Sequence, residues 1–194
     1  VTAALDAIAK ESPAIRCLVI TGTGRAFSTG ANLQGRGNGP LPRGAGYALE
    51  TQYHPFLRRL RELPYPLITA VNGPAVGIGC SLALACDLII ARESAYFLLA
   101  FVNIGLVPDG GSSLLLPERI GLARASEMAM LGERIGAKQA LEWGLVNRVA
   151  ADDEFEGAVD ELAARLAAGP TASYAGSKRQ FNERWPYDRI KELY

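Results

Sequence analysis

Short apolar runs alternate with stretches of helical spacing along this chain. The apolar runs are rich in β-branched residues and are bounded by glycine, proline or polar residues, which predicts buried strands over 16–22, 67–72, 87–91, 95–99 and 145–149. Helical spacing predicts helices over 2–10, 47–63, 80–86, 112–120, 123–131, 137–143 and 152–168, and a last helix that begins near 170–173. Because this alternation is typical of βαβ units, we expect an α/β fold with a mainly parallel sheet and crossover helices.

Glycine and proline mark the ends of these elements. Gly121, Gly132 and Gly144 each follow a helical stretch, as is common for residues that close a helix. Residues 35–46, GRGNGPLPRGAG, are so rich in glycine and proline that we expect a surface loop or a lid.

Composition indicates a folded protein of ordinary size. The chain has 194 residues, of which 49% are apolar and 21% charged, which suits one domain with a sizeable core. Its 20 basic residues balance its 20 acidic ones, which argues against a nucleic-acid partner, whose binding surface would be basic. No apolar stretch reaches the roughly 18 residues of a transmembrane helix, so we expect no membrane partner.

Histidine and cysteine content excludes further kinds of site. The single histidine, His54, cannot build a multi-histidine metal site, and a serine–histidine–aspartate triad could use only that residue. The three cysteines, Cys17, Cys80 and Cys86, have no CxxC spacing, which indicates reduced thiols and a cytoplasmic location. The chain begins without Met inside a stretch of helical spacing, so we expect both ends to be trimmed from a longer protein.

Turns rich in small residues suggest where a ligand could approach the backbone. Residues 22–27, GTGRAF, lack the third glycine of a dinucleotide-binding GxGxxG, so a plain tight turn is the alternative to a nucleotide site. The small residues of 27–33, FSTGANL, allow backbone N–H groups to face an anion or a developing oxyanion. Residues 77–79, GIG, precede the predicted 80–86 helix and serve either such an oxyanion or close helix-to-strand packing.

Four ordered segments carry a resemblance to a known family. They read LVITGTGRAFSTGANL, ITAVNGPAVGIGCSLALACDLIIA, AYFLLAFVNIGLVPDGGSSLLLPERIG and MAMLGERIGAKQALEWGLVNRV. Over residues 14–182 they resemble the crotonase (enoyl-CoA hydratase/isomerase) superfamily, and the last two are most similar to its epoxyphenylacetyl-CoA isomerase branch. The resemblance implies an α/β crotonase-type spiral of ββα units with C-terminal helices. It divides the chain into a core over 1–150 and a truncated C-terminal helical segment over 151–194.

The resemblance also implies an acyl-CoA thioester as substrate, with no metal and no separate cofactor. Two backbone N–H groups would form an oxyanion hole for the thioester enolate, and they fall on Ala31 and Ile78. Arg25 would meet a coenzyme A phosphate or stand as a solvated turn residue. The implied substrate-binding residues are Arg25, Ala26, Ser28, Gly30, Asn32, Leu33, Gly79, Ser81, Phe101 and Pro108.

The catalytic carboxylates differ from those of a family hydratase. The two glutamates with which such hydratases activate water fall here on Ser81 and Phe101, which cannot exchange a proton as carboxylates do. A third family position, used by double-bond isomerases, falls on Asp109. The resemblance therefore implies double-bond or ring-epoxide isomerisation with Asp109 as acid and base, in a pocket that Phe101 makes drier. Within a Pro-Asp-Gly turn, Asp109 could instead cap the helix that begins near Ser112.

Other polar residues have structural explanations as alternatives to chemistry. Asp87 is mostly structural in the family, and Ser81 either binds substrate or packs. His54 is expected at the surface or in packing. The arginines of the Arg58–Arg61 run are expected on a solvated helix face, with pairing to coenzyme A phosphates as the alternative.

The resemblance places the reaction in fatty acid metabolism or phenylacetate degradation and implies a homotrimer or a hexamer. Because the chain is shorter than the family's usual subunit, we expect its opening strands and C-terminal helices to be missing. Three other functions stay open: hydration under the family's usual label, non-catalytic acyl-CoA binding, and a structural oligomerisation domain.

Overall fold

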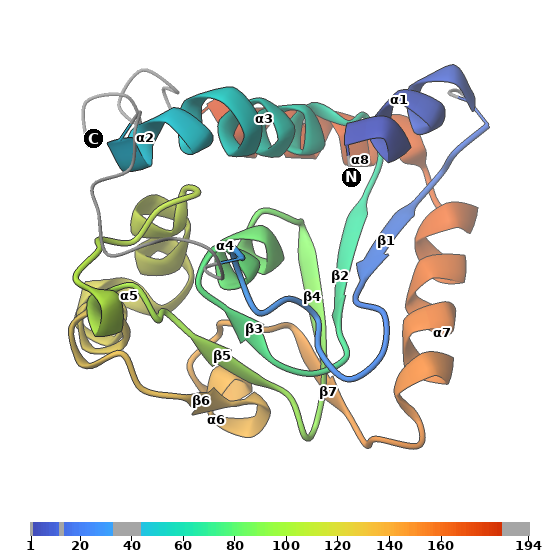
Figure 1. Cartoon of the computed structure of the whole chain (residues 1–194). Coiled ribbons are helices and arrows are strands. Elements are labelled where there is room, and N and C mark those ends of the chain that lie inside the picture. The colour runs from blue at the N-terminus through green and yellow to red at the C-terminus, as the bar shows by residue number, and fades with distance from the viewer. Residues whose placement is uncertain (1, 12–13, 33–43, 184–194) are drawn as a thin grey trace.

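Strands and helices alternate along the chain, as the apolar pattern predicts (Figure 1). The computed structural model describes residues 2–11, 14–32 and 44–183. Leu33 and most of the predicted 35–46 loop therefore lie outside the described residues. In chain order the elements are α1 (Thr2–Glu11), β1 (Leu18–Thr21), α2 (Gly44–Ala48), the π-helix η1 (Leu49–Tyr53), α3 (His54–Glu62), β2 (Leu67–Val71), β3 (Ala75–Val76), α4 (Ile78–Leu84), β4 (Leu88–Arg92), β5 (Tyr96–Leu98), the 3-10 helix η2 (Val102–Ile104), α5 (Ser112–Leu131), β6 (Ile135–Gly136), α6 (Ala137–Glu142), β7 (Arg148–Ala150), α7 (Phe155–Ala168) and α8 (Thr171–Glu183).

A parallel sheet with strand order β1-β2-β4-β7 lies at the centre of the molecule. Parallel neighbours need crossover connections. Here α2, η1 and α3 return the chain from β1 to β2, and α4 lies between β2 and β4 in the sequence. Every residue of β2 is buried, as expected for a strand whose sheet is covered on both faces.

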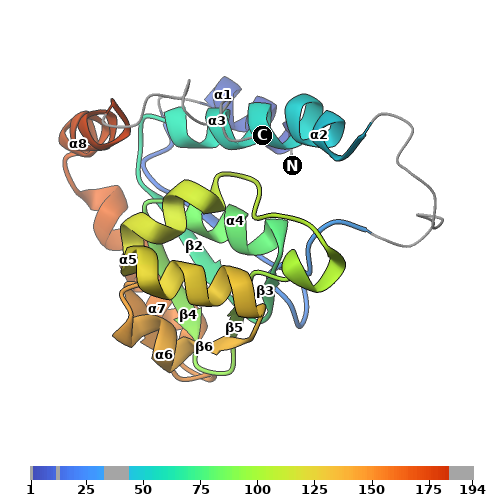
Figure 2. The same ribbon diagram turned by 90° about the vertical axis from the view of Figure 1, so that its left-hand side faces the viewer.

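Alternate residues of the strands pack against helices on opposite faces of the sheet. Ile68, Ala70 and Ile90 form one buried cluster with apolar side chains of α7. Leu67 and Ile89, on the other face, belong to the larger cluster that includes α4 and α5. In Figures 1 and 2, α7 flanks the sheet on one side, α4 and then α5 cover the other, and α3 and α8 lie along one end.

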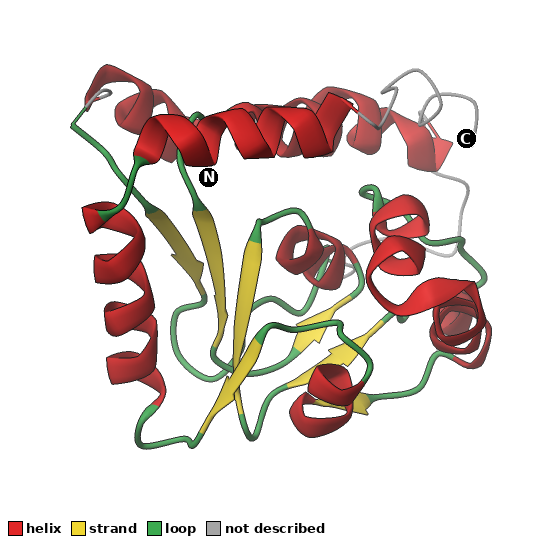
Figure 3. Cartoon of the chain, turned by 180° about the vertical axis from the view of Figure 1, so that it is seen from behind, coloured by secondary structure: helices red, strands yellow, loops and turns green. Residues whose placement is uncertain are grey.

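A second, smaller sheet has the order β3-β5-β6 (Figure 3). Its β3–β5 pair is parallel and its β5–β6 pair is antiparallel. The expectation of mainly parallel pairing is confirmed, and the β5–β6 pair is the antiparallel exception among the described strands. The strands that the pattern missed, Ala75–Val76 and Ile135–Gly136, have only two residues each and so show no period of their own.

Several predicted boundaries shift by a few residues. α4 begins at Ile78 rather than at residue 80, and β7 covers Arg148–Ala150 rather than 145–149. α2 begins at Gly44, inside the predicted 35–46 loop. The predicted break between two helices at Gly121 is confirmed, because that residue has non-helical dihedrals (φ 77°, ψ 159°) within α5. None of the described helices is long and apolar enough to cross a membrane.

Candidate active site

Two loops that are far apart in the sequence lie side by side. Ser28 forms an isolated parallel bridge with Ala75, and its carbonyl oxygen accepts a hydrogen bond of 2.8 Å from the N–H of Val76. A Cβ added to Gly79 would lie 2.5 Å from that same carbonyl oxygen, so the contact requires a glycine. The structure thus brings together the two small-residue segments that the sequence singles out.

The predicted oxyanion donors belong to these two segments. Among the residues that the structure describes, neither the N–H of Ala31 nor that of Ile78 donates a hydrogen bond. Gly30 (φ 91°) and Gly77 (φ 56°) precede them in left-handed backbone conformations. A Cβ on Gly30 would lie 3.9 Å from the nitrogen of Ile78, so the backbones approach closely here. The structure therefore has two backbone N–H groups on neighbouring loops that no described residue accepts.

Asp109 lies in the turn between η2 and α5. Its backbone carbonyl accepts hydrogen bonds from the Ser81 hydroxyl (2.8 Å), the Ser112 hydroxyl (2.7 Å) and the Ser112 N–H (3.0 Å). Its side chain does not cap α5, which follows Gly111 with no side-chain cap, so the capping alternative is wrong. The Oδ1 atom of its carboxylate is buried with no hydrogen-bond partner among the described residues. Burial raises the pKa of Asp109 from 3.8 to about 6.

The turn that carries Asp109 packs on the first turns of α4. Gly110 (φ 59°) is so close that an added Cβ would lie 2.3 Å from Cδ1 of Ile78 and 2.9 Å from Cβ of Ser81. The structure therefore brings Asp109, Ser81 and Ile78 into one neighbourhood.

The other predicted substrate-binding residues differ in exposure. Arg25 and Asn32 are exposed, whereas Ala26 and Pro108 are partly buried. Phe101 is 6% exposed and belongs to the large buried cluster, and its carbonyl oxygen accepts the N–H groups that close η2 and the following turn.

The 22–27 segment is a tight turn held by Asn72, a residue that the sequence analysis did not single out. The N–H of Gly22 donates to Oδ1 of Asn72 (3.1 Å), and Nδ2 of Asn72 donates to the carbonyl of Gly24 (2.9 Å). A Cβ on Gly22 would lie 2.1 Å from the carbonyl oxygen of Ala26. These contacts favour the tight-turn interpretation of GTGRAF over a nucleotide site.

A family model described as enoyl-CoA hydratase/isomerase matches residues 1–193. The chain belongs to the enoyl-CoA hydratase/isomerase family. The predicted crotonase fold is confirmed by a crystal structure of an enoyl-CoA hydratase from Mycobacterium avium subsp. paratuberculosis K-10. That structure superposes with a TM-score of 0.87 at 39% identity and covers 99% of this chain and 78% of its own.

Curated relatives of this family member include enzymes with different names. A 1,2-epoxyphenylacetyl-CoA isomerase of Escherichia coli (strain K12) is 44% identical over 171 residues, which cover 87% of this chain and 65% of the relative. A probable enoyl-CoA hydratase of Rhodobacter capsulatus is 43% identical over 185 residues, or 93% of this chain and 68% of the relative. The chain thus spans about two thirds of the length of these relatives, and both an isomerase and a hydratase are among them.

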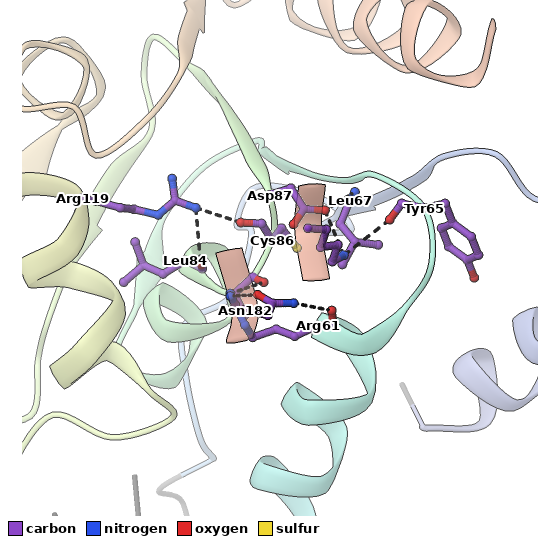
Figure 4. Close-up of polar contacts among 10 residues, drawn as sticks. Arg61, Tyr65, Leu67, Leu84, Cys86, Asp87, Arg119 and Asn182 are labelled. Carbon is purple, nitrogen blue, oxygen red and sulfur yellow. Dashed lines mark hydrogen bonds and ion pairs between the residues drawn. The ribbon is translucent and has the colours of Figure 1, made fainter. Parts of the chain in front are cut away.

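In this family member, polar side chains gather at the C-terminal end of α4 (Figure 4). Lys178 of α8, which is 8% exposed, donates to Oδ2 of Asp87 (2.9 Å) and to the carbonyl of Tyr65 (3.4 Å). The same Asp87 oxygen accepts the N–H of Leu67 at the start of β2 (2.9 Å). Asp87 therefore has structural contacts, as expected, and it attaches α8 to the core.

Two arginines hold carbonyl groups at the C-terminal end of α4 and just after it. Arg119 of α5 donates to the carbonyls of Leu84 (3.4 Å) and Cys86 (2.8 Å). Arg61 of α3 donates to the carbonyl of Ala85 (3.4 Å) and to Asn182 of α8. The prediction of a solvated helix face is therefore wrong for Arg61, because the end of α4 presents carbonyls that attract cations.

The other titratable residues that the sequence analysis considered, His54, Cys80 and Cys86, lie in separate places in the described structure. His54, partly buried at the start of α3, has its pKa lowered by burial. Cys80 and Cys86 are buried in the core as predicted. Within residues 2–11, 14–32 and 44–183, no group of three or more histidine, cysteine, aspartate or glutamate residues could hold a metal ion.

Proposed function

We propose that this chain isomerises an acyl-CoA thioester by proton transfer, with Asp109 as the acid and base and the N–H groups of Ala31 and Ile78 as the oxyanion hole. One observation carries the proposal: a carboxylate oxygen of Asp109 is buried without a hydrogen-bond partner in the described part of the chain, on a turn that packs against Ile78. A partly buried carboxylate with one oxygen shielded from water and from ion pairs has the environment of a general base rather than of a structural ion pair.

The electrostatics of Asp109 suit proton transfer in both directions. Burial raises its pKa to about 6, close to the neutral pH at which a base must both take and return a proton. The thioester oxygen would accept hydrogen bonds from Ala31 and Ile78, which stabilise the negative charge that develops on it.

The proposed reaction conserves every atom of the substrate. Asp109 takes a proton from the α-carbon of a β,γ-unsaturated thioester, and the C–H electrons enter a dienolate whose charge rests on the thioester oxygen. The same carboxyl group then gives the proton to the γ-carbon on the same face. The double bond now lies between the α- and β-carbons, and Asp109 is again ionised. A ring-epoxide thioester would use the same base and the same oxyanion hole.

The arrangement favours isomerisation over hydration by two carboxylates. The Ser81 hydroxyl donates its proton to the carbonyl of Asp109, and Phe101 is buried in the apolar core. Neither position therefore offers a second group that could activate water.

The test compares Asp109→Asn with the unchanged protein on 3-enoyl-CoA and ring-epoxide acyl-CoA esters. Products are identified by mass spectrometry in D2O, which distinguishes return of the abstracted proton from uptake of a solvent deuteron at the γ-carbon. We expect turnover to fall by about 100-fold or more, as for loss of a general base, while the dissociation constant of a saturated acyl-CoA measured by calorimetry stays within about threefold. Binding without turnover by the unchanged protein would instead favour the non-catalytic binder, and absence of acyl-CoA binding would favour a structural domain.

A homotrimer or a hexamer, and a place in fatty acid metabolism or phenylacetate degradation, are proposals that rest on the family alone. Light scattering of the purified chain tests the first, and the acyl preference in the ester panel tests the second. Arg25 is exposed, so Arg25→Ala is a direct test of the proposed contact with a coenzyme A phosphate through the dissociation constant.

A further inference from the structure

We propose that Ser81 and Ser112 are positioning residues, which hold the Asp109 carboxylate in place through hydrogen bonds from two helices to the Asp109 backbone carbonyl. We refer to these two hydrogen bonds as the serine grip. The proposal rests on the proposed function of Asp109 and assigns the serine at a hydratase glutamate position a task other than contact with substrate.

The grip is made by two hydroxyl groups on one oxygen atom. Ser81, in α4, donates to the Asp109 carbonyl at 2.8 Å, and Ser112, the first residue of α5, donates at 2.7 Å. Both serines are 0% exposed. A serine hydroxyl has one proton to donate, so each of these hydroxyls commits its proton to this contact. The Asp109 peptide is therefore attached to α4 and α5 at once.

Little else orients the Asp109 side chain. Its Oδ1 atom has no hydrogen-bond partner among the described residues, so the carboxylate takes its position from its own backbone and from packing. The next two residues, Gly110 (φ 59°) and Gly111 (φ 82°), are both in left-handed conformations. Glycines give the chain wide conformational freedom, so without the serine hydroxyls only the N–H of Ser112 (3.0 Å) and packing would hold the Asp109 carbonyl, and the turn could shift.

Small movements of this turn matter for the chemistry. Ser81 lies three residues after Ile78 on α4, so one short helix carries both an oxyanion donor and part of the grip. The grip thereby sets the distance from base to oxyanion hole. A misplacement of about 1 Å can cost roughly 100-fold in rate. Loss of either hydroxyl is therefore expected to slow proton transfer without removing a contact to the thioester.

The experiment measures Ser81→Ala and Ser112→Ala against a matched control, Thr69→Val. Thr69 is also 0% exposed, and its hydroxyl donates to a carbonyl of the same helix, that of Ala83 (3.0 Å). Each variant is assayed for kcat and KM on the ester that the unchanged protein turns over, for the pH dependence of kcat, and for Tm. All three variants lose one buried hydrogen bond, so a loss of Tm alone does not distinguish them.

We expect Ser81→Ala and Ser112→Ala to lower kcat by about 10-fold or more while KM stays within twofold of the unchanged protein. We also expect the acid-side midpoint of the pH dependence of kcat to move to lower pH, because water reaches the carboxylate in these variants. We expect Thr69→Val to leave kcat and the midpoint unchanged. The proposal is overturned if both serine variants match Thr69→Val in kcat and midpoint while Asp109→Asn is inactive, a result that leaves the proposed function standing. Turnover retained by Asp109→Asn would overturn the proposed function and the grip together.

Discussion

The charge on Asp109 is expected to destabilise the folded chain, and Asp109→Asn exposes that cost. Burial raises the folded-state pKa from 3.8 to about 6, so the folded state holds the Asp109 proton more tightly than the unfolded state does. Below about pH 3.8 Asp109 is protonated in both the folded and the unfolded state, so it does not lower the free energy of unfolding. As the pH rises toward 6 the unfolded chain loses this proton first, so the free energy of unfolding falls, and it levels off above the folded-state pKa.

The size of the effect follows from the shift in pKa. A shift of about two units corresponds to at most roughly 3 kcal/mol at 1.36 kcal/mol per unit. Because the Asp109 side chain is only partly buried and water screens it, we expect about 1–2 kcal/mol. The free energy of unfolding of Asp109→Asn minus that of the unchanged protein should therefore rise by this amount between pH 4 and pH 7. Any constant effect of the amide cancels in that comparison.

Urea unfolding at a series of pH values measures the difference by linear extrapolation. Asp152→Asn is the matched control of opposite sign, because hydrogen bonds from Ser94 lower the pKa of Asp152. Its stability relative to the unchanged protein should fall as the pH rises toward about 4 and stay nearly flat from pH 4 to pH 7, because both pKa values of Asp152 lie at or below 3.8. A difference for Asp109→Asn that stays flat from pH 4 to pH 7, or falls with pH, would refute the argument that burial raises this pKa.

Two further predictions concern the core. Lys178→Met should lower the free energy of unfolding by about 3 kcal/mol in urea titrations, because it leaves the partly buried Asp87 carboxylate without its cation. The control, Lys138→Met, removes an exposed ion pair and should leave the urea midpoint nearly unchanged. Equal effects of the two variants would contradict this prediction. A thiol reagent should label Cys17, which is partly exposed, well before Cys80, because burial raises the pKa of the Cys80 thiol to about 12. Mass spectrometry of peptides measures the two labelling rates. Equal rates would show that the core opens as readily as the surface.

The central sheet was predictable because its strands are apolar on both faces. Leu67–Val71 is apolar in all but one position, and both faces of that strand are covered in the structure. The two-residue strands of the smaller sheet were not predictable, because Ala75–Val76 and Ile135–Gly136 exist only through pairing with β5. Pairing of this kind depends on contacts between distant segments and leaves no local period in the sequence.

The candidate site was predictable in its parts but not in its contacts. Small-residue loops indicated where N–H groups could face a ligand, and the family resemblance pointed to Asp109. The contact of Ser112 with the Asp109 carbonyl was not predictable, because a serine at the start of a helix suggests only a cap. Arg61 was misjudged because helical spacing does not reveal that the carbonyls of α4, more than 20 residues away in sequence, lie beside it.

α4 connects the candidate site with the polar contacts at its C-terminal end. Its first residue, Ile78, carries a proposed oxyanion donor, and Ser81 in its middle grips the turn of Asp109. The carbonyls at and just after its C-terminal end are held by Arg61 and Arg119, while Lys178 attaches α8 to the adjoining Asp87. A helix of seven residues has few internal hydrogen bonds, so its position depends on these external contacts. Since several contacts hold its C-terminal end, loss of any one of them, such as the Thr69 hydroxyl in Thr69→Val, should leave the hydrogen bonds of Ser81 and Ser112 to Asp109 in place.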